Sequence, residues 1–290
     1  MELFFFKYHG TGNDFMIIDN RKKVFSPRAG QEQAIIALIC QRRYGVGADG
    51  LILIEDDAEE DFRMRYYNSD GKEGSLCGNG SRCAAAFAAH FIAPGKHQFR
   101  FSAVDGMHNA SVMDAHHSRP VVSVSLNQVT VPEKISQDNF FVNTGSPHLV
   151  RFVQNMEGLD VTGLGREIRH AGEWAPEGVN VNFVENMGNN TLSVRTYERG
   201  VEEETLSCGT GVTAAAIAAW FCDQQNKDQN HYKIVTSGGE LEVSFRSPEN
   251  DLQVFSDIRL KGPAQFVFRG ELDMAALEQV LTQNNELAEQ

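Results

Sequence analysis

The sequence lacks any long apolar run, which argues against a membrane-spanning helix. No stretch approaches the roughly 20 apolar residues that a helix needs to cross a bilayer. The first apolar stretch, residues 3–6, lies between Glu2 and Lys7 and is too short for the core of a signal peptide, so it predicts an opening strand. We therefore expect a soluble cytoplasmic protein with no membrane partner.

Basic residues are too few for a nucleic-acid partner. The chain has 26 lysines and arginines against 39 acidic residues, a net charge of −13 at pH 7. Proteins that bind nucleic acid normally show a basic excess or a basic stripe. Acidity by itself identifies no partner, because it also keeps proteins soluble.

Cysteine is scarce and unevenly placed. There are five cysteines, an odd number, and no Cys-x-x-Cys pair, so structural disulfides, a zinc ribbon and a thioredoxin motif are not expected. His108, His116 and His117 have no carboxylate or cysteine at ligand spacing, which favours a solvated loop over a metal site. We expect no bound metal.

An internal repeat is the most informative feature that the chain does have. Three short blocks recur in the same order, offset by 131 to 133 positions: residues 11–15, 45–49 and 77–80 match 144–148, 178–182 and 208–211. Repeats in constant order indicate a duplicated domain. Proline and charge in residues 131–134 mark the joint, so we expect a first lobe over 1–133 and a second over 134–263.

Alternation and β-branched content predict mostly strands in both lobes. The predicted strands are residues 51–54, 62–67, 99–103, 121–126, 180–185, 191–197, 232–236 and 241–245. Helices are predicted over 31–43 and 273–287, and one alanine-rich, nearly uncharged helix is predicted in each lobe, over 81–92 and 210–222. The expected fold is α+β, with two pseudo-symmetric lobes that each wrap a barrel-like sheet around a central helix.

Residues 45–50 fit the Gly-x-Gly-x-x-Gly pattern, but their context is reversed. A dinucleotide-binding loop follows a strand and opens a helix. This segment follows a predicted helix and opens a predicted strand. We therefore interpret it as a turn, and we expect no nucleotide cofactor.

Cys77 and Cys208 each lie immediately before a glycine-flanked helix start. The free N–H groups and the dipole of a helix N-terminus bind anions such as carboxylates, and they favour a thiolate over a thiol. If the repeats face one cleft, an α-carbon lies between the two sulfurs. One thiolate then removes the α-proton, and the opposite thiol delivers a proton to the other face. The sequence thus predicts inversion of a carbon centre in an amino acid.

The remaining cysteines, Cys40, Cys83 and Cys222, fall within apolar or helical runs and are expected to be buried core residues. Cys83 has no counterpart in the second repeat, where Ala214 takes its place. That difference is typical of a core position.

Five motifs together resemble the diaminopimelate epimerase family. They are residues 12–15, 67–71, 77–83, 198–200 and 208–211, and the resemblance extends from Lys7 to about Gly270. It implies conversion of LL-2,6-diaminopimelate to the meso form without pyridoxal phosphate or metal, in lysine and peptidoglycan synthesis. It also implies a homodimer, and a C-terminal segment, 264–290, whose residues 266–268 return to the first lobe as a strand.

The resemblance also assigns site residues. Cys77 and Cys208 match the catalytic cysteines, His148 matches a histidine that assists one of them, and Glu198 is implied to assist the other. The implied substrate-binding residues are Asn13, Asn68, Gly78, Asn79, Ser146, Asn180, Glu198, Arg199, Gly209 and Thr210. Among these, Glu198 and Arg199 would hold the distal ammonium and carboxylate of the substrate.

Three positions depart from the family pattern. Ser146 stands where many members have asparagine, Gly50 stands where some have glutamine, and one extra residue lies between Glu198 and Cys208. These departures concern substrate contacts and leave the reaction type untouched.

Two other functions remain open. A proline or hydroxyproline racemase on the same fold would share both cysteines but would not need Glu198 and Arg199. A thiol redox protein that forms a Cys77–Cys208 disulfide is a more distant alternative. Silent binding proteins and phenazine-type isomerases on this fold would not be expected to keep both cysteines.

Overall fold

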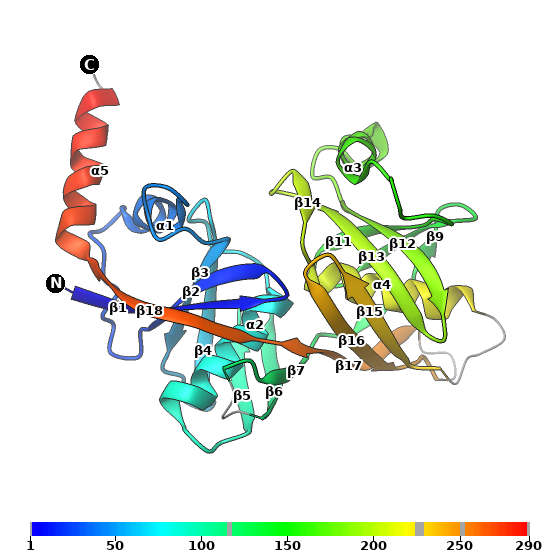
Figure 1. Ribbon diagram of the computed structural model, residues 1–290, viewed down its shortest axis with the longest axis horizontal. Coiled ribbons are helices and arrows are strands. Elements are labelled where there is room, and N and C mark those ends of the chain that lie inside the picture. Colours follow the sequence, from blue (N-terminus) through cyan, green and yellow to red (C-terminus); the bar gives the residue numbers. More distant parts are fainter. Residues whose placement is uncertain (1, 115–117, 224–228, 250–252, 289–290) are drawn as a thin grey trace. The chain divides into compact units, whose positions relative to one another are not determined.

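The computed structural model describes residues 2–114, 118–223, 229–249 and 253–288, so His116 and His117 lie outside the described part of the chain. The chain divides into two compact units (Figure 1). The first unit comprises Met1–Gly10, Asp14–Val122 and Ala264–Gln290, and the second comprises Thr11–Asn13 and Ser123–Pro263. Strands dominate with few helices, and the predicted α+β class is confirmed. None of the described helices is long and apolar enough to cross a membrane.

The sheet of the first unit alternates parallel and antiparallel pairings. β2 (Asn13–Asp19) runs parallel to β3 (Gly50–Glu55), β3 antiparallel to β4 (Phe62–Asn68), β4 parallel to β5 (Gln98–Ala103), and β5 antiparallel to β6 (Gly106–Met113). The C-terminal β18 (Gln265–Asp273) pairs antiparallel with β1 (Glu2–Gly10). The helices are α1 (Glu32–Cys40), α2 (Gly78–Phe87) with a π-helical turn η1 (Ala88–Ile92), and α5 (Met274–Ala288).

The second unit shows the same succession of pairings. β11 (Pro147–Phe152) runs parallel to β12 (Asn180–Gly188), β12 antiparallel to β13 (Thr191–Glu198), β13 parallel to β15 (His231–Thr236), and β15 antiparallel to β16 (Gly239–Arg246). Strand β7 (Val121–Ser125) begins in the first unit and ends in the second. The other elements of the second unit are β8 (Val129–Thr130), β9 (Glu133–Lys134), β10 (Asn139–Asn143), α3 (Val161–Arg169), η2 (Gly172–Trp174), β14 (Glu203–Thr205), α4 (Gly209–Cys222) and β17 (Val254–Pro263). The repeated pairing order agrees with the internal repeat in the sequence.

One alanine-rich helix fills the centre of each unit. All ten residues of α2 are buried, and the helix packs against β1, β3, β4, β6 and β18. In α4 every residue from Gly211 to Trp220 is buried, against β10 to β13, β15 and β16. Alanine combines high helix propensity with a small side chain, so strands can approach such a helix closely on every side. Each helix therefore begins at a position determined by the surrounding sheet.

The structure corrects two expectations about single residues. His108 lies in β6 and not in a solvated loop; its ring stacks on Phe101, and its Nε2 is 3.0 Å from Asp105 Oδ1. Strand alternation turns this histidine inward, where it is 1% exposed. Cys222 is exposed because it is the last residue of α4, whereas Cys40 and Cys83 are buried as expected.

Helix α3 was not predicted from the sequence. Two glycines, Gly163 and Gly165, lower its helix propensity. The helix is nevertheless capped, because the Asp160 carboxylate accepts a hydrogen bond from the Gly163 N–H at 2.8 Å. At Gly165 a Cβ atom would lie 2.3 Å from Tyr197 Cβ, so the glycine permits close packing of α3 on β13.

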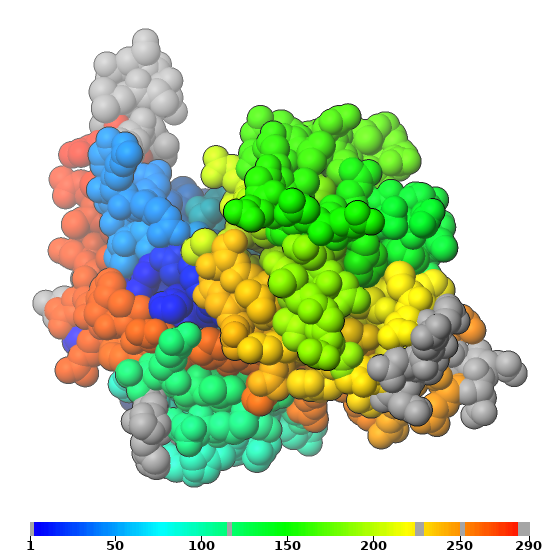
Figure 2. Space-filling model, turned by 45° about the vertical axis from the view of Figure 1, so that its right-hand side comes forward, coloured from blue at the N-terminus to red at the C-terminus, as the bar shows by residue number. Residues whose placement is uncertain are grey.

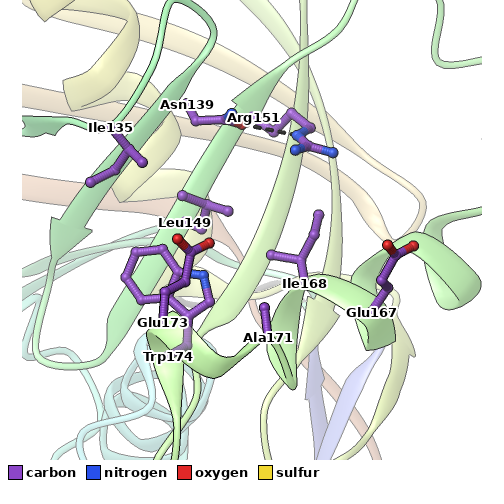
Figure 3. Close-up of a pocket in the computed structure, with 9 residues that line it drawn as sticks. All are labelled: Ile135, Asn139, Leu149, Arg151, Glu167, Ile168, Ala171, Glu173 and Trp174. Carbon is purple, nitrogen blue, oxygen red and sulfur yellow. Dashed lines mark hydrogen bonds between the residues drawn. The ribbon is translucent and has the colours of Figure 1, made fainter.

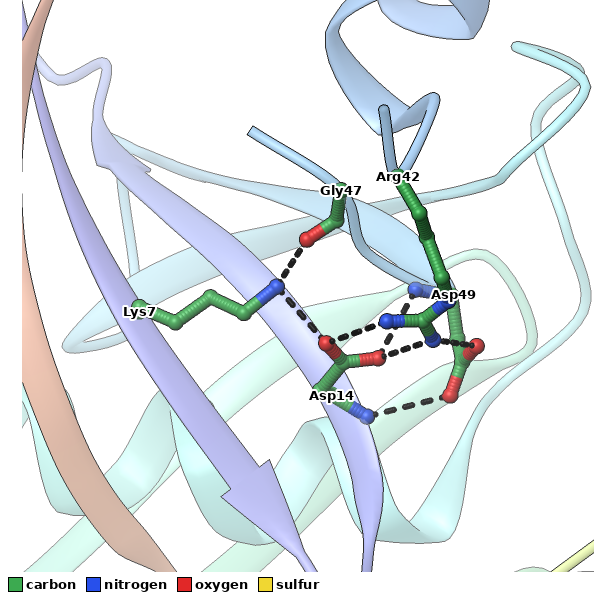
Figure 4. Close-up of polar contacts among 5 residues, drawn as sticks. All are labelled: Lys7, Asp14, Arg42, Gly47 and Asp49. Carbon is green, nitrogen blue, oxygen red and sulfur yellow. Dashed lines mark hydrogen bonds and ion pairs between the residues drawn. The ribbon is translucent and has the colours of Figure 1, made fainter. Parts of the chain in front are cut away.

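The segment of residues 45–50 is a turn that leads into β3, and an ionic cluster holds it in place (Figure 4). The buried Lys7 ammonium contacts the Gly47 carbonyl and lies 2.7 Å from Asp14 Oδ2. Arg42 binds Asp14 through two nitrogens and reaches Asp49 at 2.6 Å. Burial alone would raise the pKa of Asp14, but hydrogen bonds and charges from Arg42 and Lys7 lower it to about 2.

We expect Asp14→Asn to lower the free energy of unfolding at pH 7 by about 2 kcal/mol, because it leaves the Lys7 ammonium buried beside a neutral amide. Since the folded-state pKa of Asp14 is below its ordinary value of 3.8, the stabilisation is complete above that value and is lost as the pH falls through about 2. Urea unfolding should therefore show the difference shrinking with acidification. Asp19→Asn is the control, because Asp19 pairs with Arg21 at the surface. Equal effects of the two substitutions would show that the buried ion pair contributes no more stability than the surface pair.

Candidate functional site

Cys77 forms the N-cap of α2. Its backbone is extended, at φ −103° and ψ 111°, and its Sγ accepts a hydrogen bond from the Gly80 N–H at 3.4 Å. The sulfur therefore lies beside the backbone amides that begin a helix, where a negative charge is stabilised. Unlike Cys83, it is only partly buried, so a ligand can approach it.

A buried guanidinium lies behind Cys77. Arg82 is fully buried, and its Nη2 donates to Asn79 Oδ1 at 2.9 Å. Burial lowers the pKa of Arg82 to about 10, against an opposing effect of Cys83 and Cys77, so the group is cationic at neutral pH. Because the Asn79 side chain is directed at this cation, what Gly78 and Asn79 offer to a ligand is their backbone.

Cys208 forms the N-cap of α4 in the second unit, with nearly the same backbone conformation as Cys77. It is 7% exposed, and its Sγ lies 3.5 Å from Thr210 Oγ1. Thr210 Oγ1 in turn lies 3.0 Å from Nε2 of His148. His148 was expected to assist one cysteine; within its own unit the structure connects it to Cys208 through the Thr210 hydroxyl.

His148 is fully buried, and its ring is neutral at physiological pH. Burial, followed by the charge of Arg199, lowers its pKa to about 3, and the hydrogen bond from Asn182 only partly opposes this shift. A neutral imidazole has one donor and one acceptor nitrogen, so its two neighbours determine how it acts.

Asn180 links the first residue of β11 to the residue that follows β13. Its Nδ2 donates to the Pro147 carbonyl at 3.1 Å, and its Oδ1 accepts from the Arg199 N–H at 2.9 Å. The Asn180 side chain therefore joins Pro147 to Arg199, and the predicted residues Ser146 and Glu198 are the residues that immediately precede these two in the sequence.

The extra residue near Glu198 forms a defined turn. Glu202 adopts φ +62°, its N–H donates to the Glu198 carbonyl at 2.8 Å, and its carboxylate accepts from Gly200, Arg169 and Tyr197. Those contacts hold the backbone around Glu198 and Arg199. At Gly50, the second departure, a Cβ atom would lie 2.4 Å from the Tyr67 carbonyl, so close packing excludes a side chain there.

Asn13 and Asn68 lie at strand ends. Asn13 begins β2 and, with Thr11 and Gly12, belongs to the second unit, where a Cβ on Gly12 would meet the Leu206 side chain at 2.6 Å. Asn68 ends β4 in the first unit and is exposed. Asn13 is half-buried, and the substrate-binding roles of both residues stay predictions.

Sequence reasoning missed Arg82, Asn182 and Thr196, which are buried polar residues in contact with predicted site residues or with one another. One signal was present for Asn182. It lies two residues after Asn180 in an apolar strand, so both side chains share a face of the sheet. Among the described residues, no group of three or more His, Cys, Asp and Glu side chains could hold a metal ion.

A pocket in the second unit lies apart from these residues (Figure 3). Leu149, Ile168 and Trp174 form its apolar wall, and Arg151 and Glu167 are among its polar residues. Leu149 follows His148 in β11, and neighbouring side chains in a strand point to opposite faces. The pocket therefore lies on the other side of the sheet from the His148 network and contains none of the predicted site residues.

The chain is similar to known proteins over nearly its whole length. The family model described as diaminopimelate epimerase matches residues 5–131 and 140–267. A diaminopimelate epimerase of Flavobacterium psychrophilum is 47% identical over 91% of this chain and 97% of its own length, and one of Chlorobaculum tepidum is 42% identical over 91% and 99%.

Solved structures with low sequence identity share the fold. A phenazine biosynthesis protein of the PhzF family from Bacillus anthracis superposes with a TM-score of 0.70 at 14% identity, covering 94% of this chain and 99% of that one. A hydroxyproline epimerase from Agrobacterium vitis gives 0.65 at 14% identity, covering 93% and 91%. These likenesses support two-lobed α+β architecture and say nothing of substrate.

The two helix starts differ in how much room they leave around one glycine, so we predict different losses of stability when that glycine is replaced by alanine. A Cβ on Gly211 would lie 2.3 Å from Asn182 Oδ1, whereas on Gly80 it would lie 3.1 Å from the end of Ile52, 3.3 Å from the end of Met64 and 3.4 Å from Cys77 Cβ. We expect Gly211→Ala to lower the free energy of unfolding by about 1–3 kcal/mol, and Gly80→Ala to change it by less than about 1 kcal/mol because alanine favours the helix. Thermal and urea unfolding measure both; a larger loss for Gly80→Ala would refute this packing argument.

Proposed function

This chain belongs to the diaminopimelate epimerase family, and we propose that it interconverts LL- and meso-2,6-diaminopimelate through proton transfer by Cys77 and Cys208. It is an isomerase, and the product serves lysine biosynthesis. The observation that carries the proposed mechanism is the matched placement of the two cysteines, each as N-cap of a buried, alanine-rich helix in a unit with the same strand pairing order. No organic cofactor or metal is required by this chemistry.

Inversion needs one base and one acid on opposite faces of the α-carbon. In the proposed reaction one sulfur, as a thiolate, takes the α-proton, and the bond electrons move toward the substrate carboxylate as an enolate-like species. The other sulfur, as a thiol, gives its proton to the opposite face. The two sulfurs thereby exchange protonation states, and catalysis in the reverse direction starts from that exchanged state.

Backbone amides at the helix starts would stabilise the charge that develops on the substrate carboxylate. Gly78 and Asn79 offer such amides at α2, and Gly209 and Thr210 offer them at α4. Because these donors are held by the helix, they need no reorganisation during the reaction, which is the basis of electrostatic catalysis.

Glu198 and Arg199 would bind the distal end of the substrate, which carries an ammonium and a carboxylate. The Glu202 turn and the Asn180 side chain hold the backbone of these two residues. A guanidinium fork suits a carboxylate, and a carboxylate suits an ammonium. Asn13, Asn68 and Ser146 complete the proposed substrate contacts. A proline-type substrate has no distal ammonium and carboxylate for Glu198 and Arg199 to bind.

We expect incubation with LL-diaminopimelate in deuterated water, without added cofactor, to place deuterium at the α-carbon and to form the meso isomer. Cys77→Ala and Cys208→Ala should each reduce epimerisation by at least about 10³-fold, because each removes a group that exchanges a proton with the α-carbon. L-proline, tested in parallel, should take up no deuterium. Full activity of either variant would overturn the two-cysteine mechanism, and turnover of proline in preference to diaminopimelate would favour the racemase alternative.

The protein is further proposed to act in the cytoplasm as a homodimer. In the first unit, aromatic side chains of β1, η1 and β18 lie close together. The ring centroids of Phe6 and Phe91 are 4.5 Å apart, those of Phe91 and Phe266 are 5.7 Å apart, and Phe4 is 56% exposed. Part of β18 is visible as orange atoms in Figure 2. Contiguous exposed apolar side chains are typical of interfaces between proteins.

Sedimentation equilibrium tests this surface. We expect the wild type to be a dimer and Phe4→Glu to be monomeric, because a charge would be buried in the interface without a partner. Met187→Glu, which changes an equally exposed apolar residue in the second unit, should leave the dimer intact. A monomeric wild type would refute the homodimer, and a dimeric Phe4→Glu protein would place the interface elsewhere.

A further inference from the structure

Asn182 lies at the buried end of a chain of hydrogen bonds that reaches Cys208. It is fully buried in β12, its Oδ1 accepts from the Thr196 hydroxyl at 2.9 Å, and its Nδ2 lies 3.3 Å from the Leu149 carbonyl and 3.0 Å from His148 Nδ1. A carbonyl oxygen can only accept, so the amide nitrogen must face Leu149. The orientation of the Asn182 amide is thereby determined by its surroundings.

That orientation determines the tautomer of His148. The amide nitrogen that faces Leu149 also faces Nδ1 of the imidazole, and an amide NH₂ can only donate. Nδ1 must therefore be the acceptor nitrogen of the neutral ring. The ring proton then resides on Nε2, which lies 3.0 Å from Thr210 Oγ1.

The same direction continues to the sulfur. Thr210 Oγ1 accepts a hydrogen bond from His148 Nε2–H, so its own hydroxyl group can donate to Cys208 Sγ at 3.5 Å. Every bond of the chain, Thr196 to Asn182 to His148 to Thr210 to Cys208, then donates toward the sulfur. A donor aimed at the sulfur stabilises its negative, nucleophilic form.

We propose that Asn182 is a positioning residue for Cys208, because it fixes the Nε2–H tautomer of His148 and thereby aims the Thr210 hydroxyl at the sulfur. Thr196 supports it from behind. Asn182 does not contact Cys208 Sγ, so it acts only through the orientation of its neighbours. The contribution to catalysis, though not the tautomer itself, rests on the function proposed above.

The nitrogen signals of His148 test the tautomer directly. In protein labelled with ¹⁵N-histidine at pH 7, and with the His148 signals assigned by their loss in His148→Gln, we expect an unprotonated Nδ1 and a protonated Nε2. A protonated Nδ1 in the wild type, with either state of Nε2, would overturn the inference without any measurement of activity.

Asn182→Asp tests the consequence for the sulfur. An ionised aspartate can only accept, so it should draw the ring proton to Nδ1; Nε2 then becomes an acceptor and turns the Thr210 hydroxyl away from Cys208. We expect the Nδ1 signal to move to that of a protonated nitrogen, and alkylation of Cys208 by iodoacetamide, followed by mass spectrometry, to slow about tenfold. Cys77 in the same molecules should react at an unchanged rate. An unchanged rate at Cys208 would overturn the proposal.

Two further variants separate positioning from folding. Thr196→Val removes only the support behind Asn182 and should slow alkylation of Cys208 by about threefold, so it serves if Asn182→Asp does not fold. Asn186→Asp makes the same substitution at an exposed position in the same strand, β12, and should leave both the ring signals and the alkylation rate unchanged. If Asn186→Asp slowed the alkylation of Cys208 as much as Asn182→Asp does, the effect would be a general consequence of the added negative charge.

Kinetics distinguish this inference from the proposed function. Asn182→Asp should lower kcat for diaminopimelate about tenfold with little change in KM, because it leaves the substrate-binding groups in place. If the wild type has no epimerase activity, the proposed function fails while the tautomer and alkylation results still stand. If the enzyme is active and Asn182→Asp turns over at the wild-type rate, only the role of Asn182 fails.

Discussion

The free amides at the start of a buried helix are the constraint on which the rest of the molecule depends. A helix N-terminus carries unpaired N–H groups and a partial positive charge, and it is costly to bury unless something accepts those hydrogen bonds. In both units a cysteine stands at this position, and in α2 its sulfur accepts the Gly80 N–H. Backbone amides at a helix start also stabilise a bound carboxylate, so the structural requirement and the proposed chemistry concern the same place in the fold.

The burial of these helices follows from their composition. α2 and α4 are mostly glycine and alanine, so strands pack directly against the helix backbone, and the sheet determines where each helix begins. Because of this close packing, some positions do not tolerate a larger side chain. Gly211 exists beside the Asn182 side chain only because it has no Cβ, whereas Gly80 faces side-chain ends that can move.

The two units support their cysteines with different chemistry. Behind Cys77 lies the permanent cation Arg82, which also holds the Asn79 side chain. Behind Cys208 lies a neutral chain that starts at Thr196 and passes through a histidine whose pKa is far below physiological pH. A cation stabilises negative charge whatever its orientation, but a neutral chain does so only when every donor points the same way. Duplication thus preserved the helix start while the supporting residues diverged.

Much of this protein could be read from the sequence, because the relevant signals are local. Alanine runs, β-branched alternation and glycine-flanked cysteines depend on neighbours along the chain. They predicted the central helices, many of the strands and a helix start soon after each of the two cysteines. Helix α3 escaped prediction because packing against Tyr197 overrides the low helix propensity of its glycines. His108 was assigned to a solvated loop because its burial depends on a strand face that only the folded sheet defines.

The residues of the candidate site also fall into those that the sequence predicted and those that only the structure revealed. The sequence by itself determined which residues carry the chemistry, since Cys77 and Cys208 occupy matching places in a repeat and the helix-start pattern needs no long-range information. The tertiary structure alone decided what stands behind them. Arg82, Asn182 and Thr196 act because residues distant in sequence bring their side chains to one buried point, where each hydrogen bond must have a partner. A pattern in the sequence cannot predict these hydrogen-bond partners, because the partners are determined by which side chains the folded core encloses together and not by their order along the chain.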